Sequence, residues 1–157
     1  MDRSEKITRY EESLEQLEYL LGVEGKYALD DIGKMATIST VLKMNLPYFF
    51  FVGFYRAMEN RVLQIGPYQG DVLACGTIPY ESGVCGACAI QRKTLIVPDV
   101  SQFPGYIACD DHTRSEIVVP VMRDGELRAV LDVDSIDLDD FDEIDQRYLE
   151  ALLEAHF

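Results

Sequence analysis

Four cysteines are the residues of this 157-residue chain whose type and spacing could do chemistry. One of them, Cys109, lies in a long loop over residues 97–112, between two apolar runs that we expect to be strands. Long loops in compact chains are usually functional or disordered, and Phe103, Tyr106 and Ile107 give this one side chains to bury. We therefore predict an active-site loop that carries a reactive thiol. The possible partners of that thiol are Cys75, Cys85 and Cys88.

Cys85 and Cys88 form a C-x-x-C pair at the start of a predicted helix over residues 84–92. A helix N-terminus favours the thiolate and so lowers a thiol pKa below its reference of about 8.5. A thioredoxin-type pair would follow an early strand in a βαβ unit, whereas three predicted strands precede this one. The spacing Cys85-x2-Cys88-x20-Cys109-x2-His112 would suit zinc, although no turn-forming residues surround the first pair. Simple packing as small hydrophobic residues is the third interpretation.

Acidic side chains follow the reactive loop. Asp132 and Asp134 lie on one face of a predicted strand, because side chains alternate with period two. Glu116 enters the neighbouring strand and could reach the same place. The pair is either an exposed strand face running into a polar turn or a site that binds an ammonium group or holds a proton, since crowding raises a carboxyl pKa. The spacing leaves both open. His112 is either a proton donor or simply solvated.

The composition fits a single domain over residues 1–157. A net charge of −14 argues against nucleic acid and anionic membranes as partners, since both require a basic surface. No apolar run approaches the roughly 20 residues of a membrane span, and the charged N-terminus lacks a signal-peptide core, so we expect a cytoplasmic protein. The eight acids from Asp132 to Asp145 are predicted to form a solvated face.

The predicted elements favour an α+β fold. An apolar stripe from Ile7 to Leu21 and a helix capped at Asp30 or Asp31 and ended by Pro47 open the chain, and a helix starting near Asp140 closes it. Three strands in close succession and a closing Asp124-Gly125 hairpin favour a mainly antiparallel sheet with helices on at least one face. The predicted strands span residues 48–55, 62–65, 72–78, 94–97, 117–122 and 127–133, with Gly66-Pro67 interrupting the second.

A set of fragments in fixed order covers nearly the whole chain. Together they resemble the free methionine-(R)-sulfoxide reductases, which are enzymes built on a GAF domain. Each fragment alone is weak, but the ordered set is highly specific. The fragments are Phe51-Val52-Gly53-Phe54-Tyr55, Gly66-Pro67-Tyr68-Gln69-Gly70, Gly83-Val84-Cys85-Gly86, Phe103-Pro104-Gly105-Tyr106-Ile107-Ala108-Cys109-Asp110, Ser115-Glu116-Ile117-Val118-Val119-Pro120 and Leu131-Asp132-Val133-Asp134-Ser135.

The resemblance implies a GAF-like, six-stranded, mainly antiparallel sheet flanked by helices, often in a homodimer. It implies reduction of free L-methionine-(R)-S-oxide, with Cys109 as the attacking thiol, Cys75 as its resolving partner and Cys85 as a second thiol. The substrate-binding residues that it implies are Glu116, Asp132, Asp134, Phe51 and Tyr55.

The implied chemistry agrees with these residue types. A Cys109 thiolate would attack the sulfoxide sulfur while a carboxyl group with a raised pKa donates a proton to the oxygen. The resulting sulfenic acid would condense with a second thiol, and thioredoxin would reduce the disulfide. The reaction needs no organic cofactor and no metal. The alternative is a non-catalytic GAF-type module that binds a small ligand or senses redox state through its thiols, and turnover of the sulfoxide would separate the two.

Two positions depart from the family pattern. The family generally has Trp just before Val-Gly-Phe-Tyr, where it helps to wall the pocket for the substrate methyl group, and here Phe51 takes that place in a chain without Trp. Cys88 lies where a small residue such as Ala or Thr is expected, and it is either inert packing or an alternative resolving thiol. Neither departure removes a predicted catalytic group.

Overall fold

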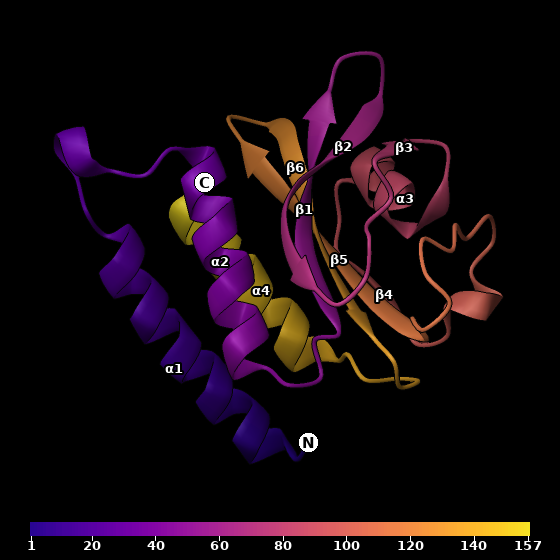
Figure 1. Ribbon diagram of the computed structural model, residues 1–157, viewed down its shortest axis with the longest axis horizontal. Coiled ribbons are helices and arrows are strands. Elements are labelled where there is room, and N and C mark those ends of the chain that lie inside the picture. The colour runs from indigo at the N-terminus through magenta and orange to yellow at the C-terminus, as the bar shows by residue number, and fades with distance from the viewer.

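A computed structural model describes all residues, 1–157, and contains one six-stranded sheet in the order β3-β2-β1-β6-β5-β4. Every pair of neighbouring strands is antiparallel, which confirms the predicted fold class (Figure 1). The four inner strands are long, and the two edge strands are short. The strands are β1 (Phe51–Met58), β2 (Val62–Gly70), β3 (Thr77–Pro79), β4 (Leu95–Val97), β5 (Ser115–Arg123) and β6 (Glu126–Ser135).

Helices cover both faces of the sheet. Helices α2 (Asp31–Asn45) and α4 (Glu143–His156) lie against one face, and α1 (Arg3–Leu21) packs across these two. On the other face lie α3 (Gly83–Gln91) and the connections around it, as Figure 1 shows. Short 3-10 turns occupy Gly25–Tyr27 and Val100–Gln102. None of the helices is long and apolar enough to cross a membrane.

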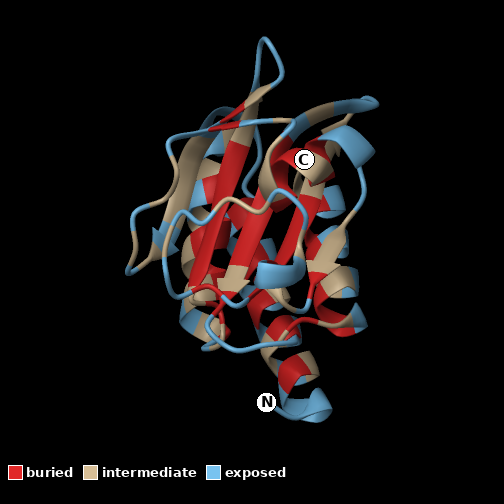
Figure 2. Ribbon diagram, turned by 90° about the vertical axis from the view of Figure 1, so that its right-hand side faces the viewer, coloured by how far each residue is buried: buried red, intermediate tan, exposed pale blue.

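Side-chain alternation gives the sheet two cores. On β1, Val52 and Phe54 face α1, α2 and α4, whereas Phe51 and Tyr55 face α3. All four side chains are buried, as predicted for a strand covered on both sides. Figure 2 views the sheet from the α3 side and shows its central strands buried beneath loops that are largely exposed.

Local signals in the sequence place several element ends correctly. The Asp30 carboxylate accepts a hydrogen bond from the Gly33 N–H at 2.8 Å, which caps α2. Asp142 caps α4 in a reciprocal capping box with Asp145. Asp124 and Gly125 have φ of 53° and 76°, as a type I′ turn requires, and they join β5 to β6.

Two strand predictions are wrong. Strand β2 continues through Pro67, where the prediction ended it. The edge strand β3 pairs only with the first three residues of β2, so no strand lies beside Pro67 on that side to accept a hydrogen bond from the N–H that proline lacks. The strand predicted over residues 72–78 is reduced to Thr77–Pro79. Cys75 thus lies in a loop instead of a strand.

The prediction of a solvated acidic face from Asp132 to Asp145 is also wrong at both of its ends. Asp132 is buried, and Asp145 is fully buried in a polar network between α1 and α4. The Lys6 ammonium lies 2.6 Å from the Asp145 carboxylate, which also accepts hydrogen bonds from the hydroxyls of Tyr10 at 2.8 Å and Tyr48 at 2.5 Å. This fully partnered ion pair ties the first helix to the last one and to the entry of β1.

We expect Lys6→Met to lower the free energy of unfolding by about 3 kcal/mol, because it leaves a buried carboxylate without its cation. Arg3→Met is the matched control, since Arg3 pairs with Glu143 across the same two helices but both side chains are exposed. Urea denaturation of both variants measures the difference. Equal losses of stability would contradict the assignment of the buried pair as the stronger link.

Candidate active site

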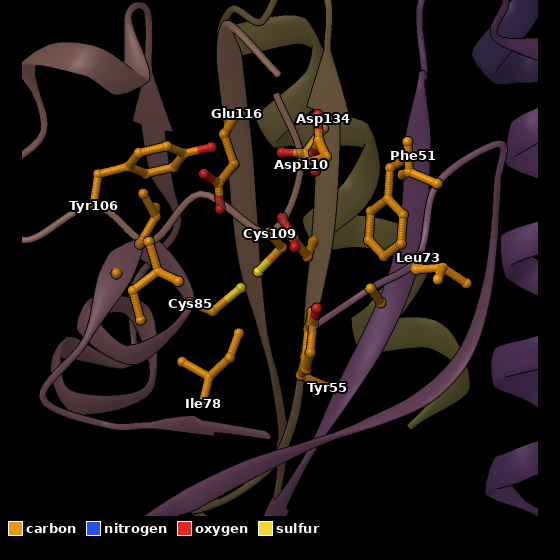
Figure 3. Close-up of a pocket in the computed structure, with 16 residues that line it drawn as sticks. Phe51, Tyr55, Leu73, Ile78, Cys85, Tyr106, Cys109, Asp110, Glu116 and Asp134 are labelled. Atoms are coloured by element: carbon orange, nitrogen blue, oxygen red, sulfur yellow. The ribbon is translucent and has the colours of Figure 1, made fainter. Parts of the chain in front are cut away.

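A pocket opens on the α3 side of the sheet and holds about 470 Å³, counting the part open to solvent (Figure 3). It lies between β1, β5 and β6 on one side and α3 with two long connections on the other. Seven of the eight predicted site residues line it, and Cys75 is bonded to one of them. The side chains that line it include Phe51, Tyr55, Leu73, Ile78, Cys85, Tyr106, Cys109, Asp110, Glu116, Asp132 and Asp134.

Three carboxyl groups enter the pocket from β5 and β6. Glu116 pairs directly with Asp134 across the two strands, and Asp132 lies two residues further along β6 on the same face. Glu116 and Asp132 are 5% and 6% exposed, and Asp134 is partly exposed. The interpretation of the two aspartates as an exposed strand face is therefore wrong for Asp132. No lysine, arginine or histidine lines the pocket. The cavity is therefore suited to a cationic group.

Burial and mutual repulsion raise the carboxyl pKa values. Burial is the largest cause for Glu116, followed by the charges of Asp132 and Asp134. Burial also raises the pKa of Asp132 from 3.8 to about 6, although hydrogen bonds with Glu116 and Cys85 oppose the rise. Burial and the Asp132 charge raise the pKa of Asp134. At least one proton is therefore held among these groups under conditions in which free carboxylic acids are ionised.

A disulfide joins Cys75 to Cys109, the pair that the resemblance implied, with the two Cα atoms 5.3 Å apart. It connects the loop before β3 to the long loop between β4 and β5. Cys109 is exposed and Cys75 partly so, whereas the free thiols Cys85 and Cys88 are buried. The exposed sulfur position thus belongs to the residue expected to react first.

The thiols of α3 behave differently from the sequence prediction. Burial, followed by the negative charges of Asp132 and Glu116, raises the pKa of Cys85 above its ordinary value, so the helix N-terminus does not make it a ready thiolate. Burial likewise raises the pKa of Cys88, whose thiol contacts the Val118 carbonyl at 3.7 Å. Cys88 does not line the pocket and packs as a small hydrophobic residue.

Asp110 shapes the loop directly after Cys109. Its carboxylate accepts hydrogen bonds from the backbone N–H groups of His112 and Thr113 at 2.6 and 2.9 Å and from the Thr113 hydroxyl at 2.7 Å. These bonds fix the chain where it enters β5. His112 is mostly exposed and does not line the pocket, which argues against it as the proton donor.

The sequence interpretation missed part of the pocket wall. The ring of Tyr106 points into the cavity, and Asp110 lines its edge beside Asp134 (Figure 3). Leu73 also lines the mouth while 83% exposed. The Pro-Gly turn before Tyr106 is the sequence feature that could have indicated its placement, because such a turn folds a loop back over its own domain.

The alternative uses of the cysteines do not fit this geometry. Cys109 is bonded to Cys75, and neither Cys88 nor His112 lines the pocket, so the zinc spacing noted in the sequence does not form one site. The sheet is antiparallel throughout and α3 is not the helix of a βαβ unit, so the thioredoxin context is absent.

Comparison with known proteins assigns the family. A profile of the GAF domain matches residues 36–155, which defines the class of protein to which this fold and pocket belong. The GAF domain-containing protein A of Dictyostelium discoideum is 43% identical over 153 residues, covering 98% of this chain and 93% of that protein. The free methionine-R-sulfoxide reductase of Saccharomyces cerevisiae is 48% identical over 105 residues, covering 65% of this chain and 58% of the yeast protein.

A solved structure extends the likeness over the whole fold. The free methionine-R-sulfoxide reductase of Neisseria meningitidis in complex with its substrate has a TM-score of 0.88 and 40% identity, covering 95% of this chain and 86% of the neisserial chain. The chain belongs to the free methionine-R-sulfoxide reductase family of GAF-domain proteins.

The raised carboxyl pKa values predict a stability cost that depends on pH. Asp132 ionises near 3.8 when unfolded and near 6 when folded, so stability falls as the pH rises between these values and the full cost is present above about 6. Asp132→Asn should therefore raise the free energy of unfolding by about 1–3 kcal/mol at pH 7.5 and by much less at pH 4.5.

Asp111→Asn is the control for that measurement, because it removes the same charge from an exposed loop position. Urea denaturation of both variants and the parent at the two pH values provides the test. An Asp132→Asn effect that is the same at both pH values, or no larger than that of Asp111→Asn, would contradict the proposed repulsion.

Proposed function

We propose that this protein reduces free L-methionine-(R)-S-oxide to methionine with the Cys109 thiol as nucleophile. The observation that carries the proposal is the placement of a disulfide-forming cysteine pair at the mouth of a pocket lined by buried carboxyl groups. A relative of 40% identity over 95% of this chain is a reductase of that substrate. The acids Glu116, Asp132 and Asp134 suit the ammonium group of a free amino acid, which a methionine within a protein chain lacks.

The first step is the transfer of the sulfoxide oxygen. After reduction of the disulfide, the Cys109 thiolate attacks the sulfoxide sulfur, and a carboxyl group among Glu116, Asp132 and Asp134 supplies a proton to the oxygen. The protonated oxygen passes to Cys109 Sγ as the sulfur–oxygen bond and the transient bond between the two sulfur atoms break, so methionine leaves in its reduced form and Cys109 is oxidised to a sulfenic acid. Burial raises the pKa values of Glu116 and Asp132, so these groups hold a proton to higher pH than free carboxylic acids do and are suitable donors for this step.

The second step restores the disulfide. The Cys75 thiol attacks the sulfenic sulfur of Cys109, water leaves with the oxygen, and the Cys75–Cys109 bond forms. A dithiol protein such as thioredoxin then exchanges with this disulfide and returns both cysteines to thiols. The partial exposure of the Cys75–Cys109 pair gives such a reductant access to the disulfide. Cys85 is buried inside the pocket beside Asp132, so in this proposal it is not the thiol that exchanges with the reductant.

The apolar part of the pocket wall suits the side chain of the substrate. Phe51 and Tyr55 on β1 and Ile78 on β3 form an apolar part of the pocket wall. The methyl and methylene groups of the substrate side chain can bury their surface against it. Tyr106 and Ile107 close the cavity from the long loop. The pocket thus combines an acidic end, which suits the ammonium group, with an apolar end, which suits the methyl and methylene groups of the methionine sulfoxide side chain.

The first test is stereochemical. Reduced protein is given free methionine-R-sulfoxide or the S epimer with thioredoxin or dithiothreitol, and methionine is measured. We expect turnover of the R epimer with little of the S epimer, because the fixed positions of thiol and acids select one arrangement around sulfur. Absence of turnover with either epimer, in folded and reduced protein, would overturn the proposal and favour a ligand-binding or redox-sensing module.

Single cysteine variants test the roles. Cys109→Ser should lower the rate by roughly a thousand-fold or more, because the nucleophile is lost. Cys75→Ser should still release about one methionine per chain in a single turnover but fail to cycle with thioredoxin, since no partner resolves the sulfenic acid. Cys88→Ser, one helical turn from Cys85, is the matched control and should behave like the parent. Activity retained in Cys109→Ser would exclude this mechanism.

A further inference from the structure

A thiol and two carboxyl groups converge inside the pocket from three different elements. The Sγ atom of Cys85 on α3 and carboxylate oxygens of Glu116 on β5 and Asp132 on β6 all lie within 4.8 Å of one another. All three residues are buried. Figure 3 shows the Glu116 carboxyl group directed downward and the Cys85 sulfur directed upward, toward the same space beside Cys109.

A second observation indicates that this cluster lacks a partner. Asp132 is only 6% exposed, and its buried Oδ1 atom has no hydrogen-bond partner. A buried carboxylate oxygen without a donor is costly, and no basic side chain lines the pocket to neutralise it. The Oδ1 atom can therefore accept a partner from outside the chain, and the lack of basic side chains in the pocket favours a cationic one.

We propose that Cys85, Glu116 and Asp132 form a binding site for Zn²⁺ inside the pocket. One sulfur and two carboxylate oxygens are ligands that this ion accepts, and a tetrahedral site would leave its fourth position to water. In such a site the ligand atoms lie about 3.3–3.5 Å apart, so side-chain movements of roughly 1 Å complete it. Mg²⁺ is disfavoured because it requires near-octahedral oxygen coordination.

Binding releases protons and transfers no electrons. Zn²⁺ replaces the thiol proton of Cys85 and any proton shared by Glu116 and Asp132, and these protons pass to the buffer. Neither Cys75 nor Cys109 takes part, so the disulfide form presents the same three ligands. This site is different from the cysteine and histidine spacing considered in the sequence, because Cys88 and His112 lie outside it.

One consequence rests on the proposed function. The ion would occupy the acids that hold the substrate, so Zn²⁺ should compete with free methionine-R-sulfoxide and slow methionine release. This makes the pocket sensitive to free zinc through groups that the reaction itself needs.

The test uses the full chain with its Cys75–Cys109 disulfide intact, which leaves Cys85 and Cys88 as the available thiols. Zn²⁺ is titrated by calorimetry, and Co²⁺ is titrated as a spectroscopic substitute whose thiolate charge-transfer absorption reports sulfur ligation. We expect one ion per chain with that absorption present. Cys85→Ser should remove the absorption, Asp132→Asn should weaken Zn²⁺ binding by roughly ten-fold or more, and Cys88→Ser should match the parent.

Other outcomes overturn the site. Absence of Zn²⁺ binding, binding unaffected by Cys85→Ser and Asp132→Asn in folded protein, or loss of the Co²⁺ absorption in Cys88→Ser would each exclude it. A separate arm measures methionine released in a single turnover of reduced protein, freed of reductant, with and without Zn²⁺. Absence of turnover without zinc would count against the proposed function, whereas the calorimetric result would still decide the metal site.

Discussion

Repulsion among three acids on one face of the sheet is the constraint on which the rest of this structure depends. Glu116 and Asp134 face each other across β5 and β6, Asp132 lies beside them, and no basic side chain enters the same cavity. Burial in these surroundings raises each pKa, which means that folding opposes their ionisation. A site of this kind is stable only if other parts of the fold supply the free energy that it loses.

The opposite face of the same strands supplies much of that free energy. Ile117, Val119, Leu131 and Val133 alternate with the acids and are essentially fully buried against the helices. Burying each such side chain contributes about 1.5–3 kcal/mol. Because the side-chain period of a strand is two, a slip of one residue would put the acids into this core and the aliphatic residues into the pocket. The register that makes the core therefore also makes the site.

The sequence was sufficient wherever local chemistry decided the outcome. Strand alternation placed Asp132 and Asp134 together, and Asp124-Gly125 specified the hairpin that aligns them with Glu116. The sequence was insufficient for the prediction where contacts between distant segments determine the structure. The segment around Cys75 has the composition of a strand, yet it forms a loop that is bonded to Cys109. The pKa of the Cys85 thiol is set by burial and by its acidic neighbours, and not by its position at the helix N-terminus. Burial and partners from distant segments are not readable from spacing.

The neighbours of Phe51, which stands where the resemblance leads us to expect tryptophan, limit the size of the ring at this position. Phe51 is 2% exposed, and its ring lies 5.4 Å from that of Tyr68 on β2. Gly53 allows this approach, because a Cβ atom there would come within 2.3 Å of the Tyr68 Cβ and 3.1 Å of the Phe51 ring. A larger ring at position 51 would have to displace Tyr68 or extend into the cavity. Phe51 and Tyr68 thus pack together as an aromatic pair, and the smaller ring at position 51 leaves that space to the cavity.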